Sequence, residues 1–261
     1  MPAPARLYKT EAIVLRQRRF GEADRMLTIY TPTLGKMDVK ARGVRKTTSR
    51  MSGHLQPLNR CMLLVAQGHT VDIVTGCETL ESFPALNDDL DRLSRALYAA
   101  ELIDRFIPER APGYPTYRLL LDTLRRLGEA DSPDIVVRFA EMRLLDQSGF
   151  MPELEVCVGC GQALSPEQNF FAPQAGGAVC RVCASDVAGP RTLSLNALKV
   201  LRLLQRGSYN EVTRLRMGED LAVETERHLR SYIVCVLERD VNAAAFIEKL
   251  RREEHRPVVE V

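Results

Sequence analysis

Two cysteine pairs stand past the middle of the chain, Cys157-Val-Gly-Cys160 and, after 19 further residues, Cys180-Arg-Val-Cys183. Each pair brings two thiolates to one side of a tight turn, and two such pairs complete a tetrahedral shell of four sulfurs. All four positions are thiols, so none is left open for a substrate. We therefore predict a metal that holds structure, and zinc suits this arrangement best.

Two alternatives to zinc exist for these cysteines. Disulfides form in oxidising compartments, but the N-terminus shows no apolar signal segment and a total of seven cysteines leaves one unpaired. Cys61, Cys77 and Cys235 lie in apolar runs, which is typical of buried free thiols. An iron–sulfur cluster also uses four cysteines, and the spacing favours zinc over a cluster without excluding it.

The segment around the cysteines, about residues 150–190, has no long periodic pattern and contains several prolines and a Gly176-Gly177 pair. It is too short to bury much apolar surface by itself. A structural zinc ion contributes on the order of 10–16 kcal/mol in zinc-finger peptides, enough to fold such a segment. We expect a zinc module carried by a larger domain.

On both sides of this module the apolar residues follow a helical period. The first helix is predicted between a cap at Asn87 or Asp88 and a stop at Pro108. Its predicted apolar face consists of Leu90, Leu93, Leu97, Ala100, Ile103 and Ile107. Further helices are predicted over 117–127, from Ser132-Pro133 to Gly149, over 194–205 and over about 219–252.

The first 80 residues follow the pattern of short strands instead. The pattern consists of four apolar runs separated by turn residues. These runs are residues 12–15, 26–30, 61–65 and 71–74. Strands at this spacing without intervening helices favour a small closed barrel of the OB or SH3 type. The predicted fold class is α+β, with a barrel domain over residues 1–82 and a helical domain carrying the zinc module over residues 83–261.

Composition excludes several classes of protein. The chain has 261 residues, of which 45% are hydrophobic and 27% charged, as in ordinary globular proteins. No apolar stretch approaches the roughly 20 residues that span a bilayer. We expect a cytoplasmic protein without membrane contact.

Charge is distributed unevenly along the chain. Residues 1–60 contain 13 Lys or Arg and 4 Asp or Glu, a net of +9, whereas the remaining residues contain 23 and 30, a net of −7. A basic segment of this strength favours a polyanionic partner such as nucleic acid. The alternative is a solvated basic surface without a partner.

The densest basic stretch covers residues 36–50 and is rich in small polar residues towards its end. It suits a mobile loop that follows a phosphate backbone without reading bases. Phe20 follows a second group of cations and could stack on a base or lie in the core of a hairpin. The candidate DNA-contacting cations are Arg16, Arg18, Arg19, Lys36, Lys40, Arg42, Arg45, Lys46 and Arg50.

Catalytic motifs are absent from the sequence. The four histidines are scattered with no HExxH pair, and no GxxxxGK[ST], GxGxxG or GxSxG segment occurs. We expect a protein that is not an enzyme. A hydrolase that uses dispersed carboxylates is the alternative.

Several stretches, taken in order, resemble the RecO family of bacterial recombination mediators. The resemblance begins with residues 8–15 and continues through Gly21-Glu22-Ala-Asp24-Arg25 and 31–35 to the basic loop 41–46, Ser49-Arg50 and Leu55-Gln-Pro57. It then includes both cysteine pairs, His228-Leu229-Arg-Ser-Tyr232 and Phe246-Ile247. No single piece is specific, but their order and spacing extend over the whole chain.

The resemblance implies an N-terminal OB-fold, a helical C-terminal domain, and zinc ligands at the four paired cysteines. It also implies DNA repair through the RecF recombination pathway, at the nucleoid. Such proteins bind single- and double-stranded DNA and anneal complementary strands without ATP. With RecR they load RecA on strands coated by the single-stranded-DNA-binding protein, and RecF is an indirect partner.

The tail of the single-stranded-DNA-binding protein is acidic with apolar ends. We therefore expect its site, on the acidic helical domain, to pair a hydrophobic groove with a few cations. Arginines on helix surfaces are more often merely solvated. The candidates are Arg202, Arg206, Arg227 and Arg230. The alternative function is that of a zinc-ribbon nucleic-acid-binding regulator without annealing activity.

Overall fold

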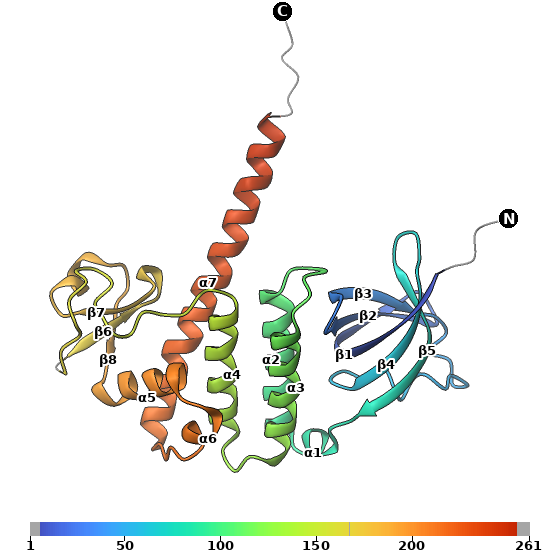
Figure 1. The fold of residues 1–261 in the computed structure, drawn as a ribbon, viewed down its shortest axis with the longest axis horizontal. Coiled ribbons are helices and arrows are strands. Elements are labelled where there is room, and N and C mark those ends of the chain that lie inside the picture. Colours follow the sequence, from blue (N-terminus) through green and yellow to red (C-terminus); the bar gives the residue numbers. More distant parts are fainter. Residues whose placement is uncertain (1–5, 167, 255–261) are drawn as a thin grey trace, which may run out of the picture. The chain divides into compact units, whose positions relative to one another are not determined.

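A computed structural model describes residues 6–166 and 168–254, with side chains described as far as Glu238 (Figure 1). The side chains of Phe246 and Ile247, which belong to the resemblance above, lie outside this description. The chain divides into two compact units, Met1–Ser148 and Gly149–Val261. In the described residues, no helix has the length and apolar character needed to cross a membrane.

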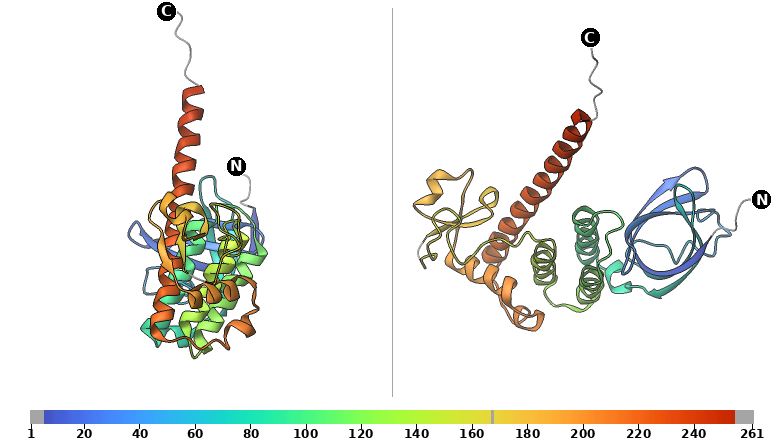
Figure 2. Two further views of the ribbon diagram at one scale, coloured as in Figure 1. Left: turned by 90° about the vertical axis from the view of Figure 1, so that its left-hand side faces the viewer. Right: turned by 45° about the horizontal axis from the view of Figure 1, so that its top comes forward.

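The first unit begins with a closed barrel of five strands. They are β1 (Leu7–Phe20), β2 (Asp24–Thr31), β3 (Gly35–Ala41), β4 (Arg60–Ala66) and β5 (Asp72–Glu81), paired in the order β1-β2-β3-β5-β4. β1 closes the barrel against β4, and β3 with β5 is the parallel pair. Figure 2 shows the strands curling around one interior. This is the strand order of an OB-fold, so the predicted α+β chain with an N-terminal OB-fold barrel is confirmed.

Alternation of buried and half-buried residues explains why these segments form strands. In β3 the side chains of Met37 and Val39 point into the barrel, while Lys36, Asp38 and Lys40 point outward. This strand was not predicted from the sequence, because three of its seven side chains are polar and the prediction relied on continuous apolar runs. Val44 and Leu55, which follow β3, complete the barrel core.

Four helices follow in the same unit and pack against one another: α1 (Pro84–Asn87), α2 (Leu90–Phe106), α3 (Tyr114–Glu129) and α4 (Pro133–Gln147). The cap of α2 is Asp89, whose carboxylate accepts the N–H groups of Asp91 and Arg92. The predicted cap at Asn87 or Asp88 is therefore wrong by one or two residues.

The buried face of α2 agrees with the prediction in part. Ala100 and Ile103 are buried as predicted, whereas Leu90 and Leu97 are 78% and 42% exposed. Ala96 and Ala99, which the predicted face did not include, are buried as well. The small alanines let α2 approach its neighbours closely, so the contact face is rotated from the predicted stripe towards them.

Within this unit, α2 and α3 are fastened to the barrel. The rings of Tyr30 and Tyr117 lie 6.2 Å apart, and the Tyr117 hydroxyl donates to the Glu11 carboxylate. Arg125 of α3 donates two hydrogen bonds of 2.7 Å to Glu81 of β5. These contacts, together with the packing of α4 on α2 and α3, explain why the compact unit ends at Ser148. The expected domain boundary at 82/83 stays a prediction, namely that the barrel folds as a domain separate from the helices.

The second unit contains a small sheet and three helices. The sheet has the order β7-β6-β8, with β6 (Asn169–Ala172), β7 (Gly177–Cys180) and β8 (Arg191–Leu193), and short 3-10 helices η1 (Pro173–Ala175) and η2 (Cys183–Asp186). The helices are α5 (Leu195–Arg206), α6 (Tyr209–Val212) and α7 (Glu219–Glu254). Phe171 of β6 meets the rings of His228 and Tyr232 of α7 edge-on, at 5.3 and 5.7 Å between centroids. The sheet is thereby joined to α7.

Candidate metal centre and nucleic-acid interface

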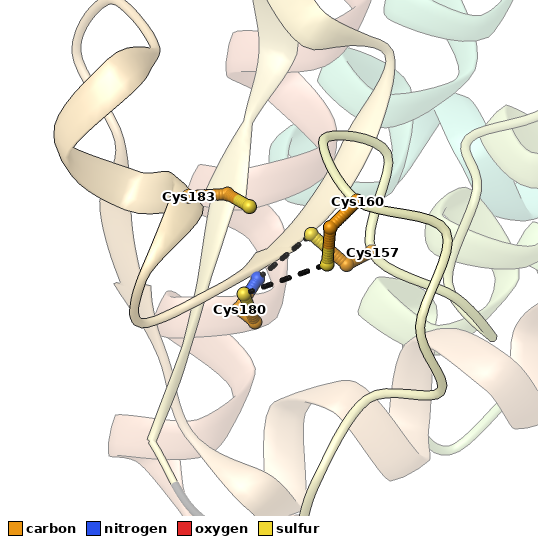
Figure 3. A group of neighbouring side chains, drawn as sticks. All are labelled: Cys157, Cys160, Cys180 and Cys183. Carbon is orange, nitrogen blue, oxygen red and sulfur yellow. Dashed lines mark hydrogen bonds between the residues drawn. The ribbon is translucent and has the colours of Figure 1, made fainter.

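The four paired cysteines come together in the second unit. Cys157 and Cys160 flank a hydrogen-bonded turn, in which the Gly161 N–H donates to the Cys157 carbonyl, while Cys180 ends β7 and Cys183 begins η2. Their sulfur atoms all lie within 4.8 Å of one another. Figure 3 shows the side chains turned towards a common centre. The predicted convergence of the two pairs is confirmed.

The spacing of the sulfurs fits a metal ion. Tetrahedral bonds of about 2.3 Å to each thiolate place sulfurs about 3.8 Å apart, and Cys160 Sγ lies 4.0 Å from Cys180 Sγ. Gly159 leaves the room for this approach, because a Cβ there would lie 2.9 Å from Cys183 Cβ and 3.1 Å from its sulfur. These four side chains could hold a metal ion with no position left for a substrate.

The ionisation of the thiols supports the same conclusion. Burial raises the pKa of Cys157, but the N–H groups of Cys180, Cys160 and Gly159 outweigh it and bring that pKa to about 6. Hydrogen bonds with the thiols of Cys180 and Cys160 raise the pKa of Cys183 to about 12. Four sulfurs this close share protons when alone, and a dication among them would favour the fully ionised shell.

The basic segment after β3 is a series of turns attached to the barrel. Gly43, with φ of +63°, donates its N–H to Asp24 Oδ1 at 2.8 Å, and Lys40 Nζ lies 3.0 Å from Asp24 Oδ2. These two contacts, that of Gly43 first, hold the pKa of Asp24 below its usual range. The guanidinium of Arg45 donates to the Glu22 carbonyl at 2.7 Å. The segment expected to be a mobile loop is thus tied to the β1–β2 turn.

These attachments leave part of the basic set open to solvent. Arg42, Lys46 and Arg50 are exposed along the segment, and Arg19 is exposed near the end of β1. Across the described ranges, none of the four forms an ion pair with a carboxylate. They are the members of the candidate set best placed to meet a polyanion.

The other candidate cations have partners within the unit. Asp104 of α2 pairs with Arg16 at 2.7 Å and with Lys36 at 3.2 Å, and the Lys36 side chain is only 13% exposed. Arg18 lies 3.5 Å from Asp38. Lys36 therefore fastens the barrel to α2, and its availability to DNA is lower than that of an exposed cation.

Phe20 lies at the end of β1 with a side chain 40% exposed, so it is not part of a hairpin core. Lys40 Nζ lies 4.5 Å from its ring centroid. A cation–π contact of this kind occupies one side of the ring.

The four candidate partner-binding arginines separate into two pairs. Arg202 donates two hydrogen bonds to the Leu154 carbonyl, and both Arg202 and Arg206 form ion pairs with Glu155. This first pair holds the segment that leads into the cysteine turn. These contacts indicate a structural role for Arg202 and Arg206.

The second pair, Arg227 and Arg230 of α7, lines an open groove of about 470 Å³. The groove runs between α7 and the ends of β6 and β8, and Arg191, Val234 and Cys235 also line it. Arg191 was not identified from the sequence, because no motif or cluster of cations surrounds it there. Only the folding of β8 beside α7 brings it to the other two arginines.

Comparison with known proteins agrees with this arrangement. Residues 5–83 match the family described as Recombination protein O N terminal, and residues 87–244 match Recombination protein O C terminal. The chain is 41% identical to the DNA repair protein RecO of Roseiflexus sp. (strain RS-1), over 95% of this chain and 87% of the relative. It is 37% identical to that of Dehalococcoides mccartyi (strain BAV1), over 94% and 96%, and 36% identical to that of Symbiobacterium thermophilum, over 94% and 98%. The chain with this basic OB-fold barrel and four-cysteine module therefore belongs to the RecO family of DNA repair proteins.

Proposed function

We propose that this protein is a recombination mediator that binds single- and double-stranded DNA and anneals complementary strands without ATP. The observation that carries the proposal is the set of exposed, unpaired cations on the OB-fold barrel of a RecO-family chain. On this proposal it acts with RecR to load RecA on coated single strands, and with RecF indirectly. Its action is one of binding and positioning, without a catalytic group of its own.

The proposed mechanism is electrostatic. Two DNA strands repel each other through their phosphates, and a basic surface that neutralises several phosphates on each lowers that repulsion. Arg42, Lys46 and Arg50 project from turns that are tied to the barrel, so they present charge at one place without ordering a free loop. Contacts of this kind carry little sequence preference, which suits annealing of any complementary pair.

Annealing of complementary strands coated with the cognate single-stranded-DNA-binding protein, without ATP, tests the proposal. The triple variant R42Q/K46Q/R50Q should anneal more slowly than the wild type and bind oligothymidylate with a salt slope lower by about 2, since each phosphate contact contributes about 0.7. The matched control K199Q/R214Q/R216Q removes the same charge from exposed positions of the second unit.

Two results would contradict the proposal. Tight binding of bare DNA without annealing of coated strands would favour the alternative, a zinc-ribbon regulator. Equal annealing by the triple variant and its control would remove the basic segment from the DNA-binding surface.

We propose that the groove lined by Arg191, Arg227 and Arg230 receives the tail of the single-stranded-DNA-binding protein. Three arginines against one carboxylate, Glu238, leave the lining net positive and suit the acidic part of such a tail. Val234, which is 47% exposed, supplies apolar surface for its end. Arg202 and Arg206 are less suited, because Glu155 and the Leu154 carbonyl already occupy them.

A tail peptide provides the test of this groove. R227Q/R230Q should weaken its binding by about tenfold or more, because two charge-assisted contacts are lost. K199Q/R214Q should bind it as the wild type does. Loss of binding in R202Q/R206Q but not in R227Q/R230Q would place the docking site elsewhere.

For the cysteine cluster we propose structural zinc. Four thiolates in two tight turns suit zinc, and the packing of Cys157 with Ala172 and Val179 makes the cluster part of the module's core. Zinc would hold the β6–β7 sheet against the preceding turn. Metal analysis of the purified protein distinguishes zinc from iron, and an iron–sulfur chromophore would overturn this assignment.

A further inference from the structure

A second cationic hollow lies at the end of the barrel opposite the basic segment. Its volume is about 350 Å³. The β2–β3 turn, the β4–β5 loop, the start of β1 and the chain after α2 meet there. The residues that line it are Arg6, Tyr8, Lys9, Thr33, Leu34, Gln67, Asp72 and Arg110. We propose that this hollow is a further phosphate-binding site for single-stranded nucleic acid, an inference that rests on the proposed DNA-binding function.

The hollow has a surplus of positive charge. Arg6, Lys9 and Arg110 are exposed, and in the part of the chain that the structure describes none of them forms an ion pair. The only carboxylate in the lining, Asp72, is already engaged. Its two oxygens accept the Tyr8 hydroxyl at 2.6 Å and the Gly68 N–H at 3.0 Å. These neutral donors orient Asp72 without cancelling its charge, so the three cations and Asp72 give the lining a net charge of +2, which is available to an anion from outside.

Arg110 is held in place by an unusual backbone. Its φ of +55° lies in the left-handed region, which residues other than glycine rarely adopt. The Arg110 N–H donates to the Lys36 carbonyl at 2.8 Å, and the next residue packs against Gly35, where a Cβ would lie 2.3 Å from the Ala111 carbonyl oxygen. Backbone outliers that the fold enforces are concentrated at functional sites, and here the outlier fixes the backbone from which the Arg110 side chain lines the hollow.

The chemistry of the lining favours a nucleic-acid strand over an acidic peptide. Arg6 and Lys9 come from the start of β1 and Arg110 comes from the chain after α2, and cations spread over two segments suit successive phosphates better than a single carboxylate. Thr33 and Gln67 offer hydrogen bonds to sugar or base, and the half-buried ring of Tyr8 beside Leu34 offers a small apolar face. That face is small for the apolar end of a peptide.

The position of the hollow also fits one strand contacting the whole barrel. β3 begins at Gly35, beside the hollow, and ends at Ala41, where the basic segment starts. Seven residues of strand span roughly 20 Å. A single OB-fold occupies about 4–16 nucleotides, which is long enough to reach both sites.

Binding of an oligothymidylate of about 16 nucleotides, measured by fluorescence anisotropy over a series of salt concentrations, tests the proposal. The variant K9Q/R110G should bind about tenfold more weakly at low salt, and its salt slope should be lower by about 1.4, for two phosphates at about 0.7 each. The control R105Q/R118Q removes the same charge from exposed arginines on α2 and α3 that lie outside the hollow.

Glycine at position 110 separates binding from folding. It removes the guanidinium and prefers the left-handed backbone, so R110G should unfold at a temperature equal to or above that of the wild type. R110K, which keeps the charge, should retain most of the affinity. Weaker binding by a variant that is fully folded cannot then be attributed to damage of the barrel.

The outcomes distinguish this inference from the proposed function. If the wild type does not bind DNA, the proposed function fails. If R42Q/K46Q/R50Q binds weakly but K9Q/R110G binds like its control, this inference alone is overturned. It is also overturned if K9Q/R110G binds DNA normally and loses affinity for a polyglutamate peptide instead.

Discussion

Gly159 is the residue on which the geometry of the metal site depends most directly. It lies inside the first cysteine turn, with the Cys183 side chain beside its Cα. A methyl group there would push the second pair of cysteines away from the first. We expect G159A to weaken zinc retention roughly 10–100-fold, the range found when groups around a metal shell are disturbed. Competition with a chromogenic chelator measures this.

The control is G218A, because Gly218 also lies in the second unit and has no atom within 4 Å of an added Cβ. It should retain zinc as the wild type does. If G159A retains zinc as well as the wild type does, the turn accommodates the added methyl group without loss of affinity, and the prediction is contradicted.

Glu11 is the titratable residue that most directly couples the barrel to its helices. Its carboxylate lies 2.7 Å from Arg60 Nε and accepts the Tyr117 hydroxyl. The hydrogen bond from Arg60, ahead of the opposing effect of burial, lowers the Glu11 pKa from its ordinary 4.5. A lowered native pKa means that the stabilisation is complete above about pH 4.5 and is lost as the pH falls through the native value.

We therefore expect E11Q to lower the free energy of unfolding of the first unit by roughly 1–3 kcal/mol at pH 7, because Arg60 loses a charged partner. The difference between E11Q and the wild type should shrink below pH 4.5. Urea unfolding across this pH range measures both effects. E78Q, a change of an exposed carboxylate on the same barrel, should show neither. A pH-independent difference would contradict the linkage.

At the scale of elements, the barrel depends on the helices that follow it. Residues 1–82 alone would lose the Tyr117–Glu11 and Arg125–Glu81 contacts and uncover Tyr30, which is fully buried in the whole chain. We expect a chain that ends at Ser148 to unfold cooperatively, and one that ends at Ser82 to unfold at a clearly lower temperature. Circular dichroism melts compare the two. Equal melting temperatures would support the predicted domain boundary at 82/83 over this dependence.

Elements also show where local patterns mislead. In α2 the predicted apolar face was right at Ala100 and Ile103, but it included Leu90, which is exposed, and missed the buried Ala96. In β3 the alternation of Lys36, Asp38 and Lys40 with apolar residues was a valid strand signal, because the barrel buries only one face. These basic residues were interpreted from the sequence as possible DNA contacts, and the strand in which they lie was not predicted.

At the scale of the whole molecule, the candidate metal site and the proposed DNA-binding cations belong to different compact units. The cysteine cluster lies in residues 149–261, and the exposed cations of the basic segment lie in residues 1–148. Removing the metal with a chelator, or through C183S, should loosen the β6–β7 sheet and leave the affinity for bare DNA within about twofold of the wild type. Hydrogen exchange and anisotropy report the two effects.

The matched control for C183S is C77S, since Cys77 is a half-buried thiol of the barrel outside the cluster. It should retain the metal. A large loss of affinity for bare DNA on metal removal would show that the second unit also carries a major DNA surface. We expect metal removal to slow the annealing of coated strands, because one wall of the proposed docking groove belongs to the cysteine module.

Much of the architecture follows from the sequence by itself. Several features depend on neighbours a few residues apart: the two cysteine pairs, the strand-like runs of the first 80 residues, the helix starts at Ser132-Pro133 and Ser194, and the concentration of positive charge before residue 60. Backbone geometry links such neighbours directly, through the two-residue period of strands, the 3.6-residue period of helices and the tight turn of a cysteine pair.

Only the tertiary structure decided which charged side chains are free. Lys36 and Arg42 stand six residues apart in one basic stretch, yet Asp104, far along the chain, pairs with Lys36 and leaves Arg42 exposed. Arg110 and Arg191 reach their hollows in the same way, through segments distant in sequence. The availability of a charge depends on which distant carboxylate folding brings within a few ångströms, and no local pattern carries that information.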